Sequence, residues 1–208
     1  MNALLVLLAL ALAVGVALSF PAEGPSAVVF CSAVGVGAGA LASRHKTHAR
    51  FLLQVFAGAV LIRAAIGTLI YYFKLQEFFG GDVFTYDFRG TMYVQFWRGN
   101  MGYAYYSQVI GPSVYRNWGM DYTVGAIYWV VGRNMLAVQF FNAVVGAATA
   151  PVIFLCARQI FQNMRVAKIV TLFVTFYPSL VRQLARPPFD MSRPRVRQTS
   201  PADALTLK

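Results

Sequence analysis

Apolar runs separated by short polar segments dominate the pattern of positions along the chain. Four or five of these runs are long enough to cross the hydrocarbon core of a bilayer, which takes about 20 helical residues. Because proline cannot continue a helix, the segment 21–25 separates the first two runs. We expect an all-α polytopic membrane protein with about five transmembrane helices, over residues 2–20, 27–42, 51–73, 135–161 and 166–181.

The first apolar run, residues 2–20, admits two interpretations. It is a retained transmembrane helix, or it is a secretory signal peptide that is cleaved after Ala17-Leu18-Ser19, which loosely fits a small-residue cleavage site. The run lacks the basic start of a signal peptide, and this favours the retained helix. Both interpretations give the rest of the chain the same topology.

Two short basic segments set the expected orientation in the membrane. Residues 43–50 form the first, and Arg158, Arg165 and Lys168 form the second. Short basic loops stay in the cytoplasm by the positive-inside rule, and the two segments agree. We therefore expect an integral protein of the bacterial plasma membrane with residues 74–121 on the extracytoplasmic side.

The long loop 74–121 is amphipathic and aromatic rather than continuously apolar. Tyrosine and tryptophan rings favour the headgroup region, where their polar tips reach water. An apolar residue recurs every four positions, which predicts an interfacial helix over 84–98 on the outer membrane surface. The recurring residues are Phe84, Phe88, Met92 and Phe96. Residues 122–131 then predict a short helix or re-entrant turn that ends at 132–134.

The composition agrees with a membrane protein and excludes several function classes. With 58% hydrophobic and 12% charged residues, the chain lies outside the balance of soluble domains. Cys31 and Cys156 lie within apolar runs, so they indicate no disulfide framework. No phosphate-binding loop, dinucleotide fingerprint, serine triad or zinc motif occurs, and no motif indicates nucleic-acid binding. Acidic residues, of which the chain has seven, remain as the candidates for chemistry.

Two of these acids, Asp82 and Asp87, follow the third apolar run within the segment 80–87. A carboxylate at the rim of the bilayer can act as general base on an acceptor hydroxyl. It can also help to bind a divalent cation, so the sequence leaves open whether the protein uses a metal. Arginines nearby are expected to hold the phosphate of a lipid-linked donor. These arginines are Arg89, Arg98, Arg116 and Arg133.

Each acid also has a structural interpretation. Asp82 follows two glycines and suits the N-cap of the predicted helix as well as it suits catalysis. Asp87 is expected on the solvated face of that helix, paired with Arg89 or Arg98. Spacing alone does not decide between these roles.

Residues 51–181 resemble the N-terminal part of the C-fold glycosyltransferases related to dolichyl-phosphate-mannose:protein mannosyltransferases, glycosyltransferase family 39. That family has an apolar helix, then an Asp and soon an aromatic residue, matched here by 61–73, Asp82 and Tyr86. The resemblance implies sugar transfer from a polyprenyl-phosphate donor to an extracytoplasmic acceptor, with Asp82 as the catalytic carboxylate and Tyr86 near the substrate. Similarity to the family's later helices lies in 134–146, Ala157-Arg158, Ala167 and 177–181.

The pattern departs from that family after residue 181, where family members continue into further membrane helices. Residues 182–208 hold six basic and two acidic residues with several prolines, which predicts a disordered tail. This basic tail would emerge outside, against the positive-inside rule. We interpret it as a truncated or frameshifted terminus, and we expect the chain alone to have little or no transferase activity.

Three segments organise the sequence, and other function classes remain open. Residues 1–50 form a transmembrane hairpin with its basic loop, 51–181 form the glycosyltransferase-like domain, and 182–208 form the tail. The alternatives are a non-enzymatic membrane assembly or scaffold protein, and a fragment of a lipid-linked-sugar flippase or polymerase. Each of them would also have the lipid bilayer as its environment.

Several residues within the apolar runs are best interpreted as packing residues. Arg63 lies near the middle of its span, so it is expected to face the protein interior and to have a partner. Gly35 and Gly39 permit close approach of another helix. Gln139 and Asn142 are expected to form hydrogen bonds between helices.

Overall fold

A computed structural model describes residues 3–43, 48–75, 82–100, 102 and 111–176, without the side chains of residues 42, 82 and 111–118. This part of the chain contains helices and no strand, which confirms the all-α prediction. The helices are α1 (Ala3–Ser19), α2 (Gly24–Ser43), α3 (Ala49–Tyr72), α5 (Asp82–Trp97), α7 (Gly111–Val131), α8 (Met135–Phe161) and α9 (Met164–Phe176).

Three described helices are long and apolar enough to cross a membrane, so the prediction of about five spans is wrong. They are α3, α8 and the Gly24–Leu41 part of α2. Helix α1 has 17 residues, which at 1.5 Å per residue is shorter than the hydrocarbon core of about 30 Å. Helix α9 has 13 residues, and residues 177–181 of the expected last span lie outside the described part.

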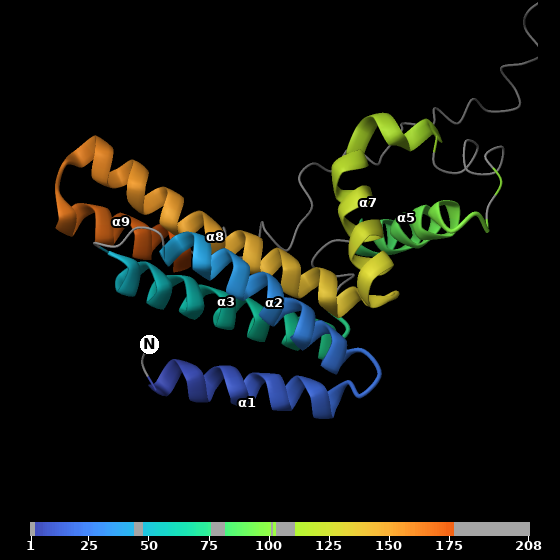
Figure 1. Ribbon diagram of the computed structural model, residues 1–208, viewed down its shortest axis with the longest axis horizontal. Coiled ribbons are helices and arrows are strands. Elements are labelled where there is room, and N and C mark those ends of the chain that lie inside the picture. Colours follow the sequence, from blue (N-terminus) through green and yellow to red (C-terminus); the bar gives the residue numbers. More distant parts are fainter. Residues whose placement is uncertain (1–2, 44–47, 76–81, 101, 103–110, 177–208) are drawn as a thin grey trace, which may run out of the picture.

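Helix α8 is the centre of the helix bundle, in contact with α2, α3 and α9 (Figure 1). Small buried residues, Ala143, Gly146, Ala147 and Ala150, let its neighbours approach closely. Phe154 is fully buried near the end of α8 that leads to α9. Helices α5 and α7 lie together beyond the opposite end of the bundle (Figure 1).

Basic residues without acids gather at one end of the helix bundle. At one end, the α2–α3 and α8–α9 connections meet, with the His48 and Phe154 rings 5.5 Å apart. Lys168 lies there over the Phe51 ring at 5.3 Å. The fold therefore brings the described end of the first predicted basic connection next to the second, as a shared side of the membrane requires. All described acidic residues lie toward the other end, in the α1–α2 turn and in α5 and α7.

Capping residues set the end of α7 and the start of α8, the helices next to α5. Helix α5 occupies nearly the predicted range of 84–98. Gly132, with φ of 81°, ends α7 and donates from its N–H to Tyr128 O at 3.0 Å. Asn134 is the N-cap of α8 and accepts from Ala137 N at 2.9 Å. The predicted break at 132–134 is confirmed. The helix before it begins at Gly111, earlier than the predicted start at residue 122, because the first turns are too polar to show a hydrophobic pattern.

Helices α5 and α7 cross at two glycines. A Cβ at Gly90 would overlap Val124 Cγ1 and would stand 3.0 Å from Val124 Cβ. A Cβ at Gly125 would stand 3.0 Å from Trp97 Cη2 and 3.1 Å from Tyr93 Cβ. These two positions allow the close approach that fixes which side chains of α5 face α7.

Gly90→Ala is expected to destabilise the packing of α5 on α7 by about 1–3 kcal/mol, because the β-branched Val124 has little freedom to move. Amide hydrogen exchange across the two helices measures this change. The matched control is Gly119→Ala in α7, where a Cβ meets nothing within 4 Å and alanine favours the helix by about 0.5–1 kcal/mol. Equal exchange rates in the two variants would contradict this account of the crossing.

The packing predictions within the bundle have mixed outcomes. Arg63 is buried and donates from Nη2 to Thr175 O of α9 at 3.0 Å, which confirms a carbonyl partner. A Cβ added at Gly39 would stand 3.6 Å from Leu53 Cδ2 of α3, whereas a Cβ added at Gly35 would meet nothing within 4 Å. Gln139 lies against Gly67 of α3, and its buried Oε1 has no hydrogen-bond donor within the described residues, against the prediction.

Candidate functional site

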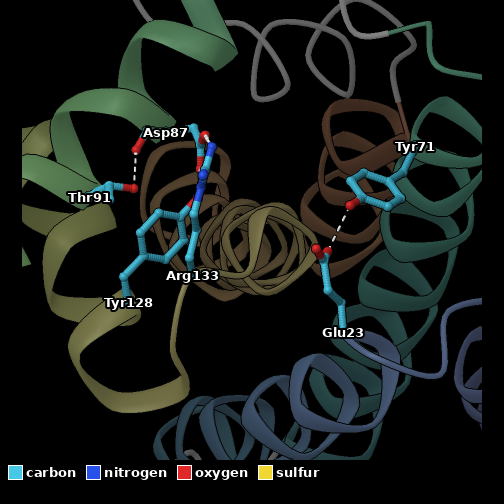
Figure 2. A network of polar contacts seen from close by, with 6 residues as sticks. All are labelled: Glu23, Tyr71, Asp87, Thr91, Tyr128 and Arg133. Atoms are coloured by element: carbon cyan, nitrogen blue, oxygen red, sulfur yellow. Dashed lines mark hydrogen bonds and ion pairs between the residues drawn. The ribbon is translucent and has the colours of Figure 1, made fainter.

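An ion pair between Asp87 of α5 and Arg133 of the α7–α8 break forms the centre of the site (Figure 2). Arg133 Nε donates to Asp87 Oδ1 at 3.2 Å, and Arg133 Nη2 donates to the other oxygen, Oδ2. The Tyr128 hydroxyl donates to Oδ1 at 2.6 Å. Both carboxylate oxygens are therefore occupied, and they join α5 to the end of α7.

Asp87 is buried, so its predicted place on the solvated face of the helix is wrong. The reason is the phase of α5, which turns Asp87, Gly90 and Val94 toward α7. Its partner is Arg133, 46 residues away, rather than Arg89 or Arg98. An ion pair across two crossing helices cannot be recognised from spacing within one helix.

The two members of the pair differ in their exposure to solvent. The Arg133 side chain is 67% exposed, whereas the Asp87 side chain is 7% exposed. A guanidinium has five N–H donors, and the side-on contact with Asp87 uses two of them. The hydrogen bond and the charge of Asp87 raise the pKa of Arg133 further above its ordinary value. Arg133 thus stays charged and keeps donors directed away from Asp87.

A small hollow lies beside Arg133, between α5 and the end of α7. It has a volume of about 90 Å³, room for a few heavy atoms, since a water molecule occupies about 30 Å³ in the liquid. Two arginines, Arg98 and Arg133, contribute to its wall. Arg98 also lies over the Trp129 ring at 5.6 Å, which orients its guanidinium. The other lining residues are Thr91, Val94, Gln95, Tyr128 and Gly132.

A second polar group joins the start of α8 to the α1–α2 turn. The Tyr71 hydroxyl donates to Glu23 Oε2 at 2.7 Å, and Figure 2 shows this pair apart from the Asp87 group. Buried Asn134 donates from Nδ2 to Glu23 O at 2.8 Å and to Ser26 Oγ at 2.9 Å. The residue next to Arg133 is thereby fixed to the N-terminal hairpin. An Asn before an apolar run signals a helix N-cap, and this signal was present in the sequence.

A third polar contact, between Arg89 and Asp121, lies in the same interface of α5 and α7. Asp121 is fully buried, and Arg89 Nη1 lies 3.7 Å from its Oδ2. Neither carboxylate oxygen has a hydrogen-bond donor within the described residues. Burial raises the pKa of Asp121 to about 6, and the charge of Arg89 offsets only part of this effect. No pattern in the sequence indicated that this acid would be buried.

The remaining predicted site residues are scattered. Tyr86 is buried in α5 rather than open to a substrate. Asp82 is the first residue of α5 and Arg116 lies in α7, and the side chains of both lie outside the described part. Of the predicted set, the structure brings together Asp87, Arg98 and Arg133.

The hypothesis of a divalent cation remains a prediction. Among the described residues, no three His, Cys, Asp or Glu side chains gather into a metal-binding group. Asp82, the acid with the strongest sequence argument, is outside that search because its side chain is not described.

Comparison with protein-family models, with curated proteins and with solved structures finds no match for this chain. The resemblance to glycosyltransferase family 39 therefore stays a prediction. What supports a function is the arrangement of charged side chains at the α5–α7 end of an integral membrane protein.

Proposed function

We propose that this chain binds the phosphate of a polyprenyl-phosphate-linked sugar in the hollow beside Arg133, as part of a membrane glycosyltransferase. The observation that supports this most is the side-on contact of Arg133 with buried Asp87. The contact holds a largely exposed guanidinium in one orientation and leaves three of its donors for a second anion. Arg98 supplies a second positive charge at the same hollow.

The depth of the hollow favours a lipid-linked phosphate over a soluble one. Arg133 stands two residues before α8, a helix long enough to cross the membrane. A side chain at such a helix end reaches the headgroup region, the level at which lipid phosphates lie. The phosphate of a prenyl carrier would enter the hollow while its apolar chain stays in the bilayer.

The chemistry that suits this arrangement is substitution at the sugar carbon that carries the phosphate. An acceptor hydroxyl oxygen forms a bond to that carbon, and the carbon–oxygen bond to the phosphate breaks with its electron pair leaving on the phosphate. Arg98 and Arg133 would stabilise the leaving phosphate. By the family resemblance, Asp82 would take the hydroxyl proton as general base, whereas Asp87 and Tyr128 would position Arg133.

Calorimetric titration of the purified chain in detergent micelles with a short-chain prenyl phosphate tests the binding step. Arg98→Gln is expected to lower affinity about tenfold, because one charge-assisted contact with phosphate contributes about 1.5–3 kcal/mol. Arg50→Gln, which removes an exposed charge at the other end of the bundle, is the matched control. The corresponding prenyl alcohol should bind much more weakly than the phosphate.

Equal binding of the prenyl alcohol and the prenyl phosphate, or equal affinity of Arg98→Gln and Arg50→Gln, would overturn the proposal. Asp82→Asn is expected to retain the affinity for prenyl phosphate, since the proposed base acts on the acceptor. Loss of any measurable sugar transfer in that variant would support the catalytic role of Asp82.

A scaffold role is the second candidate, and one observation favours it. At Gly35 and Gly37 of α2, a Cβ would meet nothing within 4 Å. Small residues on an open helix face leave room for a helix of another protein. If the wild-type chain binds prenyl phosphate and prenyl alcohol with equal affinity, the scaffold role becomes the better explanation.

A further inference from the structure

The basic end of the bundle, opposite the proposed phosphate hollow, has cations without acids. Four exposed basic residues lie there, namely Arg50, Arg158, Arg165 and Lys168. No described acidic residue lies at this end. These four charges are therefore not neutralised by acids of the described residues, and an anion from the surroundings would be bound favourably.

A hollow of about 390 Å³ lies on the last two turns of α8, at this same end. Its lining includes one guanidinium and two amide groups, from Arg158, Gln159 and Gln162, together with the apolar Leu155. Gln162 has the left-handed φ of 49° and donates from its N–H to Arg158 O at 3.0 Å. The αL cap thereby fixes the Gln162 backbone relative to the helix turn that carries Arg158.

The length of α8 places this hollow at headgroup depth. The helix has 27 residues and is about 40 Å long at 1.5 Å per residue, close to the thickness of a bilayer with its headgroups. One turn before Leu155 on α8, Val152 is 59% exposed. Polar donors thus stand next to open apolar side chains, which suits a molecule with a charged head and acyl chains.

We propose that this hollow binds the headgroup of an anionic phospholipid. Arg158 contacts the phosphate, the amides of Gln159 and Gln162 donate to the headgroup oxygens, and Leu155 and Val152 contact the acyl chains. The apolar wall and its depth favour a lipid over free phosphate. This site is independent of the prenyl-phosphate site, since it lies at the other end of the bundle.

Two charge-removing variants separate a specific site from general attraction to a basic surface. Arg158→Gln removes a charge that lines the hollow, and Arg165→Gln removes a charge from the same end outside the lining. The purified full chain is titrated with vesicles of phosphatidylcholine containing 5% or 20% phosphatidylglycerol, and native mass spectrometry counts retained lipids. Arg158→Gln is expected to lower phosphatidylglycerol retention about tenfold, and Arg165→Gln by less than twofold.

A further pair of variants tests the amides without changing charge. Gln162→Gly keeps a left-handed conformation that glycine adopts readily and removes one donor, and Gln159→Leu removes the other at similar size. Each is expected to lower retention about threefold with unchanged helix content in far-ultraviolet circular dichroism. Equal losses for Arg158→Gln and Arg165→Gln, equal retention of phosphatidylcholine, or displacement of the lipid by millimolar inorganic phosphate would overturn the proposal.

Discussion

Arg133→Ala is expected to destabilise the packing of α5 on α7 by about 3 kcal/mol, more than Asp87→Asn, although both variants break the same ion pair. The first variant leaves a buried carboxylate with only the Tyr128 hydroxyl as partner. The second leaves a guanidinium that is already largely in water, and it should cost about 1–2 kcal/mol. The asymmetry follows from the difference in burial between the two side chains.

Urea unfolding in detergent micelles, followed by tryptophan fluorescence, measures this difference directly. The chain has three tryptophans, Trp97, Trp118 and Trp129, and all three belong to α5 or α7. The double variant Arg133→Ala with Asp87→Asn serves as the control and should unfold close to Asp87→Asn, because no buried charge then remains. Equal destabilisation by the two single variants would contradict the buried state of Asp87.

The stability of the α5–α7 pair is expected to fall as pH rises from about 4 to 7, because of Asp121. Its pKa in the folded chain is about 6 against an ordinary value of 3.8, so the folded state holds the proton more tightly than the unfolded state. The stabilisation is complete below the lower value and is lost as pH passes the higher one. A difference of this size corresponds to about 3 kcal/mol.

The same tryptophan measurement at pH 4.5 and pH 7.5 tests this expectation in wild type and in Asp121→Asn. The variant does not ionise at this position, so the wild type should lose stability relative to the variant as pH rises. Contributions from the other ionisable groups are common to both proteins and cancel in the comparison. A constant difference between the two proteins across this pH range would show that Asp121 has an ordinary pKa.

The hydrophobic pattern predicts individual helices well where an apolar run is continuous. The run 51–73 corresponds closely to α3, and the four-residue repeat over 84–98 corresponds to α5. The pattern overstates the number of spans, since apolar composition alone does not report whether a helix such as α1 reaches the necessary length. Local periodicity fixes a helix, whereas its membrane role depends on its length.

The partners within the site depend on contacts that no local pattern contains. Arg133 was predicted as a phosphate-binding residue, but its contact with Asp87 arises because Gly90 and Gly125 let α5 and α7 cross closely. The burial of Asp121 has the same origin. Charge and residue type thus indicated the region of the site, and the crossing of two helices decides which charges meet.

The gathering of basic residues without acids at one end of the helix bundle makes the inserted chain sensitive to the electrical potential across the membrane. Moving one elementary charge through 100 mV changes the free energy by about 2.3 kcal/mol. The charges of Arg50, Arg158, Arg165 and Lys168 favour the orientation that places the basic end on the negative side, whereas acids at the other end are offset by cations there, such as Arg133 beside Asp87 and Arg89 beside Asp121. The membrane potential itself would then oppose inversion of the inserted chain.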